Sequence, residues 1–251
     1  MKLIQRYFLE LAYFGKPFVG WQSQPNGISV QSTVEKTLST ILQQEIKVMG
    51  CGRTDAGVHA SQFYLHFDGP EILPEHFLDR INKMVGLAIA FRMIHKVEPE
   101  AHVRFDATKR SYTYFLNGNK NPFTKDFSTF FPQMNQLDFN LMQSAVQLLL
   151  NYKEFFPFCK TNSDAQTMLC DLSESKWVQK TKQEWEFHIT SNRFLRGMVR
   201  LIVGMSLKVG QGKMSLLEVE SAMNDQKMIE KSFSAPAEGL FLSAIKYPYI
   251  S

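Results

Sequence analysis

Hydrophobic and polar positions in the first hundred residues follow periods that predict strands and helices in a regular order. Alternation of apolar and polar residues is typical of strands, and apolar residues every three to four positions are typical of helices. Ser32 and Glu35 fit a capping box in the first helix. The pattern predicts strands over 3–14, 45–51, 62–68 and 87–97, and helices over 30–42 and from Pro74. This order is that of a ferredoxin-like unit of about 100 residues.

The second half shows the same kinds of element in a looser arrangement. Asp138 fits the N-cap of a helix, and apolar residues over 194–209 keep the most sustained helical period in the chain. The pattern also predicts a strand over 103–116, a hairpin over 177–189 and a final strand over 241–247. We therefore predict an α+β fold in which two ferredoxin-like (RRM-like) halves, 1–102 and 103–251, share a largely antiparallel mixed sheet with a central active-site cleft.

Composition places the chain among soluble globular proteins. Of its 251 residues, 44% are hydrophobic and 21% charged, and the net charge of +4 is compatible with a nucleic-acid partner without indicating one. The cysteines, Cys51, Cys159 and Cys170, form no CxxC pair, and the histidines show no ligand spacing, so we expect neither disulfides nor a metal site. No signal peptide or membrane span is indicated, and we expect a cytoplasmic protein.

The most informative local pattern is a glycine-flanked acidic loop, Gly52-Arg53-Thr54-Asp55-Ala56-Gly57-Val58-His59-Ala60. Glycines around Asp55, between two expected strands, indicate a tight loop that carries a carboxylate at its tip. Arg53 lies two positions earlier, so in extended backbone both side chains leave the same face. A guanidinium at that place would keep the carboxylate ionised. The alternative is a β-turn held by an ordinary surface ion pair.

Two aromatic segments are candidates for contact with RNA. Trp21 and Gln22 lie in a loop where they could stack on a base and hydrogen-bond to it; the alternative is a Trp buried at the loop base. On the strand after 102, Arg110 and Tyr112 share a face with Tyr114 in an RNA-facing pattern. The alternative for these tyrosines is ordinary strand packing.

Three arginines on the predicted helix over 194–209 and directly before it form another candidate surface. Arg193, Arg196 and Arg200 fall within roughly 60° of one another at helical spacing, nearly opposite the apolar face. Such a group is usually a solvated face. Its functional interpretation is a row of phosphate contacts or a partner for a carboxylate.

Taken together, these segments resemble the tRNA pseudouridine synthase A family nearly end to end. The resemblance rests on segments in the family's order, which begin at Gly20-Trp21, Gly52-Arg53, Arg104-Phe105, Phe194-Leu195 and Ala235-Pro236. It implies a base-flipping isomerase that converts uridine to pseudouridine at position 38, 39 or 40 of the tRNA anticodon stem-loop, without metal or organic cofactor. It also implies a homodimer that holds tRNA at the anticodon stem-loop and the elbow.

The resemblance further implies roles for individual residues. Asp55 matches the family's essential aspartate, Tyr112 the tyrosine that stacks on the flipped base, and Arg200 the basic residue that pairs with the aspartate. Arg53 matches the arginine that holds the target nucleotide out of the stack, and the expected substrate contacts also include Trp21, Gln22 and Arg110. Phe14 departs from the family, which usually has Asp there, so the first loop is expected to differ.

Two other functions are compatible with the same scaffold. A non-catalytic RNA-binding protein or RNA chaperone is the first, although it would have no need for an ionised carboxylate beside an anionic ligand. A nucleoside hydrolase or glycosidase is the second, and it would require another carboxylate near the first.

Overall fold

The computed structural model describes residues 4–160, 166–229 and 233–250. Contacts divide the chain into two compact units, one formed by Met1–Thr108 with Phe241–Ser251 and the other by Lys109–Leu240. The sequence had placed the boundary at 102 and the last strand in the second half. Each unit combines helices with a sheet, which confirms the predicted α+β class.

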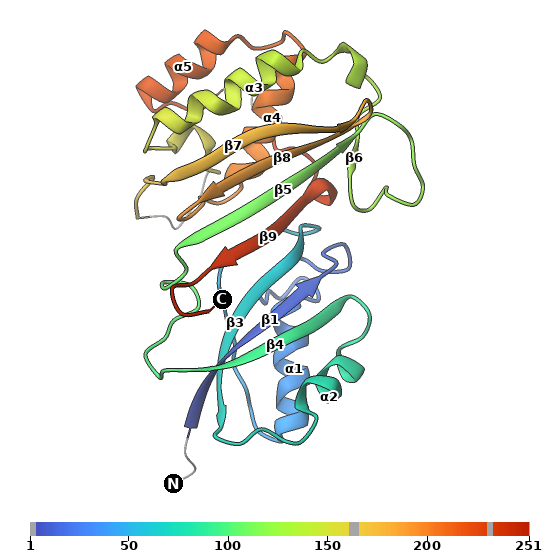
Figure 1. The fold of residues 1–251 in the computed structure, drawn as a ribbon, viewed down its shortest axis with the longest axis vertical. Coiled ribbons are helices and arrows are strands. Elements are labelled where there is room, and N and C mark those ends of the chain that lie inside the picture. Colours follow the sequence, from blue (N-terminus) through green and yellow to red (C-terminus); the bar gives the residue numbers. More distant parts are fainter. Residues whose placement is uncertain (1–3, 161–165, 230–232, 251) are drawn as a thin grey trace. The chain divides into compact units, whose positions relative to one another are not determined.

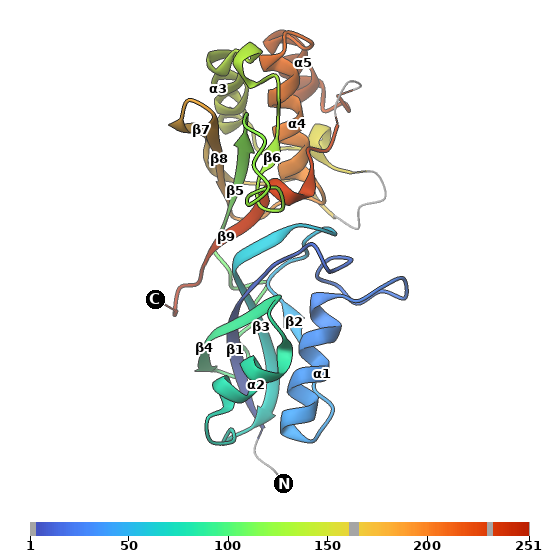
Figure 2. The ribbon, with the colours of Figure 1, turned by 90° about the vertical axis from the view of Figure 1, so that its right-hand side faces the viewer.

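The first unit has the predicted ferredoxin-like order of elements. In chain order these are β1 (Ile4–Tyr13), α1 (Val30–Leu42), β2 (Met49–Gly50), β3 (His59–Pro70), α2 (Phe77–Val85) and β4 (Ile89–Val97). The strand β9 (Leu240–Lys246) joins them, in the order β4-β1-β3-β9, with β2 beside β3. The β3–β9 pair is parallel and the others are antiparallel. Helices α1 and α2 lie on one face of this sheet (Figure 2).

Burial explains why the central strand has apolar residues on both faces. Phe8 and Leu9 are successive positions of β1, and neither exposes any surface. The cap of α1 corrects the sequence analysis: Ser29 is the N-cap and forms the capping box with Ser32, one turn earlier than expected. The strand predicted over 45–51 is shorter, since only Met49–Gly50 pairs.

The second unit is also a sheet with helices on one side (Figure 1). Its strands pair in the order β6-β5-β8-β7, antiparallel except for the short β5–β6 pair. The strands are β5 (Lys109–Asn117), β6 (Thr129–Phe130), β7 (Leu172–Thr181) and β8 (Glu184–Ser191). The helices are α3 (Phe139–Leu148), α4 (Met198–Gly210) and α5 (Leu216–Asp225), with single 3₁₀ turns at Met134–Gln136, Leu149–Asn151, Phe156–Phe158 and Ala237–Gly239. Asp138 caps α3 as predicted, by accepting a hydrogen bond from the Leu141 amide.

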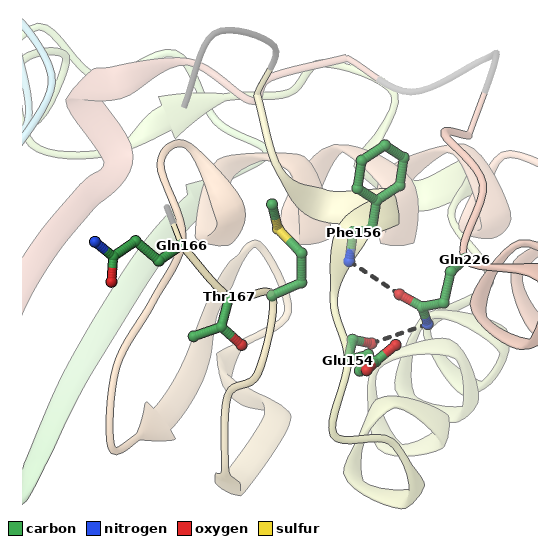
Figure 3. A pocket seen from close by; sticks show the side chains of 6 residues that line it. Glu154, Phe156, Gln166, Thr167 and Gln226 are labelled. Atoms are coloured by element: carbon green, nitrogen blue, oxygen red, sulfur yellow. Dashed lines mark hydrogen bonds between the residues drawn. The ribbon is translucent and has the colours of Figure 1, made fainter. Parts of the chain in front are cut away.

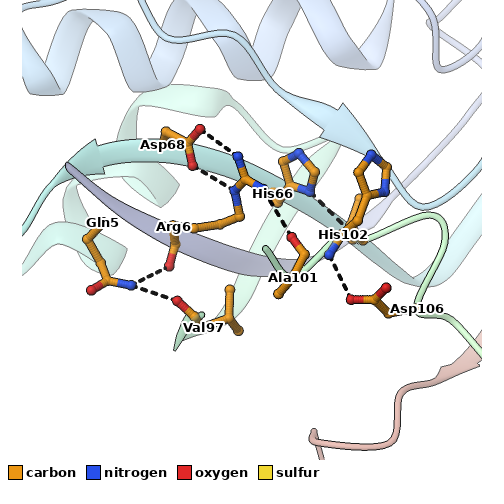
Figure 4. Close-up of polar contacts among 9 residues, drawn as sticks. Gln5, Arg6, His66, Asp68, Val97, Ala101, His102 and Asp106 are labelled. Carbon is orange, nitrogen blue, oxygen red and sulfur yellow. Dashed lines mark hydrogen bonds and ion pairs between the residues drawn. The ribbon is translucent and has the colours of Figure 1, made fainter. Parts of the chain in front are cut away.

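The strand predicted to begin at 103 begins instead at Lys109, because 101–106 forms a turn that is held by β1 and β3 of the first unit (Figure 4). The Val103 amide donates to Nδ1 of His66 at 3.2 Å, and Nη1 of Arg6 donates to the Ala101 carbonyl at 3.2 Å. Burial, with the Arg6 guanidinium nearby, lowers the pKa of His66 to about 4. The ring is therefore neutral near pH 7, and its Nδ1 is available as an acceptor.

Candidate active site

The acidic loop lies between β2 and β3 of the first unit, and its tip is a tight turn. The Val58 amide donates to the Asp55 carbonyl at 3.2 Å, and Gly57 has a φ of 78°, which favours glycine. Asp55 is half-buried and Arg53 is exposed. The loop therefore offers a partly shielded carboxylate on a defined turn, as the sequence predicted.

Residues 13–21 contact this loop at Thr54, the residue before Asp55, and hold it in place. The Tyr13 hydroxyl and the Thr54 Oγ1 are 2.8 Å apart and buried, and the Trp21 amide donates to the Thr54 carbonyl at 3.1 Å. Gly20 has a φ of 113°, and a Cβ there would lie 2.7 Å from the Thr54 carbonyl oxygen. Both the side chain and the backbone of Thr54 are thus fixed, which limits where Asp55 can lie.

His59 closes the loop on its other side. Its Nδ1 accepts a hydrogen bond from the Gly15 amide at 3.0 Å, so the proton of the neutral ring is on Nε2. The ring stacks against Phe14, with centroids 5.2 Å apart, and against Phe241 of β9, at 4.5 Å. Phe14, which stands where the family usually has Asp, therefore packs its ring on His59 of the acidic loop.

Removing the hydroxyl in Tyr13→Phe is expected to lower kcat by about tenfold while the KM for tRNA stays within about twofold, because it loosens Thr54 and hence Asp55. Steady-state kinetics measures both values. Thr54→Val should behave like Tyr13→Phe, and Thr54→Ser, which keeps a hydroxyl, should restore most of kcat. Equal kcat values for the Val and Ser variants would show that the hydroxyl pair does not position Asp55.

Trp21 lies where the sequence alternative placed it, buried at the base of its loop. Only 3% of its surface is exposed, and its ring stacks on Phe63 with centroids 4.0 Å apart. A Cβ at Gly50 would lie 2.6 Å from the indole, so the other side is packed as well. Core residues thus cover the ring of Trp21, as the alternative interpretation held, and this arrangement does not present the ring for stacking on a base. Gln22, its neighbour, is exposed.

The second unit carries the other predicted site residues, two of them on β5. Nη1 of Arg110 donates to the Asn192 carbonyl at 2.7 Å, and the half-buried Tyr112 makes a T-shaped contact with Phe194, with ring centroids 5.1 Å apart. Tyr114 exposes no surface, and its hydroxyl is 2.6 Å from Oγ1 of Thr129. Tyr114 is therefore a core residue, as the alternative interpretation held, whereas Tyr112 lies at the surface of the unit.

Contrary to the expectation from the sequence, Arg200 does not share a helix face with the other two arginines. Gly197 has a φ of 73° and α4 begins after it, so Arg193 and Arg196 precede the helix and share no face with Arg200. Nε of Arg200 donates to the Ala235 carbonyl at 2.6 Å, and the Ala235 amide donates back to the Arg200 carbonyl at 2.9 Å. The guanidinium is thus oriented by a backbone segment, which no helical periodicity could predict.

A pocket of about 340 Å³ lies in the second unit, apart from Arg110, Tyr112 and Arg200 (Figure 3). Gln226 spans part of its wall: its Oε1 accepts from the Phe156 amide at 3.2 Å, and its Nε2 donates to the Glu154 carbonyl at 3.1 Å. No predicted site residue lines the cavity. Within the described ranges there is no group of three or more side chains suited to hold a metal ion.

Comparison with known proteins decides the family. A model of the tRNA pseudouridine synthase family matches residues 145–248, a span that includes Arg200. A tRNA pseudouridine synthase A from Bacteroides fragilis is 40% identical over 247 residues, which cover 98% of this chain and 97% of the relative. The chain belongs to the tRNA pseudouridine synthase A family. Relatives of the same name from Porphyromonas gingivalis and Staphylococcus saprophyticus are 40% and 31% identical, over 97% and 96% of this chain.

Membership in the tRNA pseudouridine synthase A family makes the chain an isomerase that acts on uridine in tRNA. This confirms the enzyme class that the motifs implied. None of the helices in the described part of the chain is long and apolar enough to cross a membrane.

The sequence analysis missed the residues that support the predicted ones. Tyr13 and Thr54 fix the loop of Asp55, and the backbone of Ala235 orients Arg200. Thr54 and Ala235 lie in segments that carry the resemblance, which was the available signal for them, whereas Tyr13 precedes Phe14, the position that departs from the family. Their contacts join positions tens of residues apart, so no local pattern revealed them.

Proposed function

We propose that this tRNA pseudouridine synthase modifies uridine 38, 39 and/or 40 of the anticodon stem-loop, with Asp55, Tyr112 and Arg200 acting on the same uridine. The main support is the Asp55 loop, which holds a half-buried carboxylate on a turn braced by Tyr13, Trp21 and His59. A site that must act on one bond of a large substrate needs such a preorganised group. We further propose that the enzyme is a cytoplasmic homodimer, needs no cofactor and contacts the tRNA elbow as well.

The chemistry is an internal rearrangement that consumes nothing. The bond from N1 of uracil to C1′ of ribose breaks, the base turns, and C5 bonds to C1′. The hydrogen of C5 leaves as a proton while N1 gains one, so the atoms balance. Asp55 attacks C1′, stabilises positive charge that develops there, or removes a proton from C2′, and the three routes remain alternatives.

The other residues act on the base and on charge. Tyr112 on β5 is half-buried and not fully enclosed, which supports stacking of its ring on a flipped uracil. The guanidinium of Arg200 suits a carboxylate or phosphate partner. The proposed contacts to the displaced nucleotide and its neighbours are three. Arg53 is exposed in the loop of Asp55, Arg110 lies on β5, and Gln22 is exposed in the loop after Trp21.

Site choice is tested with anticodon stem-loops that carry a single uridine at 38, 39 or 40, and with one that has uridine only at 32. After incubation with enzyme, pseudouridine is located by carbodiimide modification and reverse-transcriptase stops. Stops at one or more of the positions 38–40, and none at 32, are expected. Efficient modification at 32 with none at 38–40 would refute the proposed site.

A further inference from the structure

The segment over 118–128, between β5 and β6, exposes more aromatic surface than a loop needs. It extends from the sheet of the second unit beside β6 (Figure 1). Phe123 is 88% exposed and Phe127 is 46% exposed. Single exposed apolar residues are common on protein surfaces, but two phenylalanines on one short loop indicate a contact surface. We call this segment the aromatic loop.

The aromatic loop is closely hydrogen-bonded, so its rings are displayed by an ordered backbone. At its base, β6 pairs with the end of β5, and the Gly118 amide donates to the Gln183 carbonyl at 2.8 Å. At its tip, Oδ1 of Asn121 accepts from the Phe123 amide at 2.9 Å. The Thr124 carbonyl then accepts from the Phe127 amide at 2.9 Å. An ordered loop presents a ring with little entropy left to lose on binding.

The charges on the aromatic loop favour an anionic partner. Lys120 and Lys125 are exposed and flank Phe123 in the sequence, with Asp126 as the single acidic residue of 118–128. An exposed ring flanked in the sequence by two lysines suits single-stranded RNA, because an aromatic face stacks on unpaired bases while lysines neutralise phosphates. A purely apolar protein interface would be depleted of lysine.

We propose that the aromatic loop is a second tRNA contact, in which Phe123 stacks on an unpaired base and Lys120 and Lys125 hold the adjacent phosphates. It is separate from Tyr112: the five residue steps along β5 from Tyr112 to Asn117 span about 17 Å at the usual rise, and the loop begins beyond Asn117. The proposal rests on the chain acting on tRNA, but not on which uridine is modified.

The test compares affinities for unmodified tRNA in filter binding at several salt concentrations. Phe123→Ala should weaken binding roughly tenfold, and Phe123→Tyr, which keeps a ring, should restore it. The pair Lys120→Ala and Lys125→Ala should lower the salt slope by about one to two. Ile72→Ala, at a position 82% exposed in the first unit, and Lys83→Ala, at an exposed position of α2 in the same unit, are the matched controls. Both control variants should bind tRNA as tightly as the wild-type protein.

Sedimentation of each variant distinguishes RNA contact from self-association. Weaker binding by Phe123→Ala with an unchanged sedimentation coefficient supports the proposal. Affinity equal to that of Ile72→Ala refutes it, and so does a fall in affinity that accompanies loss of a larger species, because the loop is then an interface between copies. Pseudouridine formation at saturating tRNA is measured in parallel. If the unmodified protein binds tRNA through the loop but makes no pseudouridine, the proposed function fails and the loop contact stands.

Discussion

Replacing Asp55 by Asn is expected to lower turnover by at least about a thousandfold, since removing the central group of a catalytic unit typically costs this much or more. The amide is nearly the same size but neither attacks C1′ nor accepts a proton as a carboxylate does. The brace on Thr54 from Tyr13 and Trp21 does not involve the Asp55 side chain, so the loop should keep its shape. Pseudouridine in digested tRNA, measured by mass spectrometry, gives the rate.

The matched control is Asp79→Asn, the same substitution at an exposed position of α2 in the same unit. It should leave the rate unchanged. The affinity of Asp55→Asn for tRNA should stay within about threefold, which would separate loss of chemistry from loss of binding. A rate within tenfold of the unmodified enzyme would mean that Asp55 is a structural turn residue, as the alternative from the sequence held.

Gly204→Ala is expected to destabilise the protein by about 2–4 kcal/mol and to reduce activity with it. Gly204 lies one turn after Arg200 on α4, and a Cβ there would overlap the carbonyl oxygen of Phe233. Alanine favours a helix over glycine by about 1 kcal/mol, but this gain is smaller than the cost of moving a packed backbone segment. The displaced segment includes Ala235, whose carbonyl orients Arg200. Urea denaturation measures the stability loss.

The control for Gly204→Ala is Gly52→Ala, where among the described residues no atom beyond the chain neighbours lies within 4 Å of the added Cβ. Its denaturation midpoint should remain close to that of the unmodified protein. If Gly204→Ala were as stable as Gly52→Ala, the segment that contains Phe233 and Ala235 would not be packed tightly on α4, and the orientation of Arg200 would need another cause.

Long periodic segments were predicted well because burial imposes their pattern directly. β1, β3, β4 and α1 lie where the alternation and the helical period put them. In α3, one capping residue, Asp138, was enough to place the start of the helix. These features depend on neighbours in the sequence, so a single chain contains the information.

Features decided by distant contacts were not predictable in this way. The start of β5 depends on the binding of 101–106 by Arg6 and His66, more than thirty residues away. The start of α4 depends on Gly197, which adopts a left-handed conformation inside a run of helical period. The burial of Trp21, a loop residue, depends on Phe63 in β3. The site residues Asp55, Tyr112 and Arg200 came from the resemblance, and local chemistry alone left each with an ordinary structural alternative.

The most direct measurement of the central claim is tritium release from tRNA labelled at C5 of uridine. Isomerisation must expel the C5 hydrogen, whereas binding alone and glycosidic hydrolysis leave it in place. The unmodified protein should release tritium to water in proportion to the pseudouridine formed, without free uracil, and Asp55→Asn should release none above background. Binding of tRNA with no release from either protein, or free uracil that retains its tritium, would contradict the account.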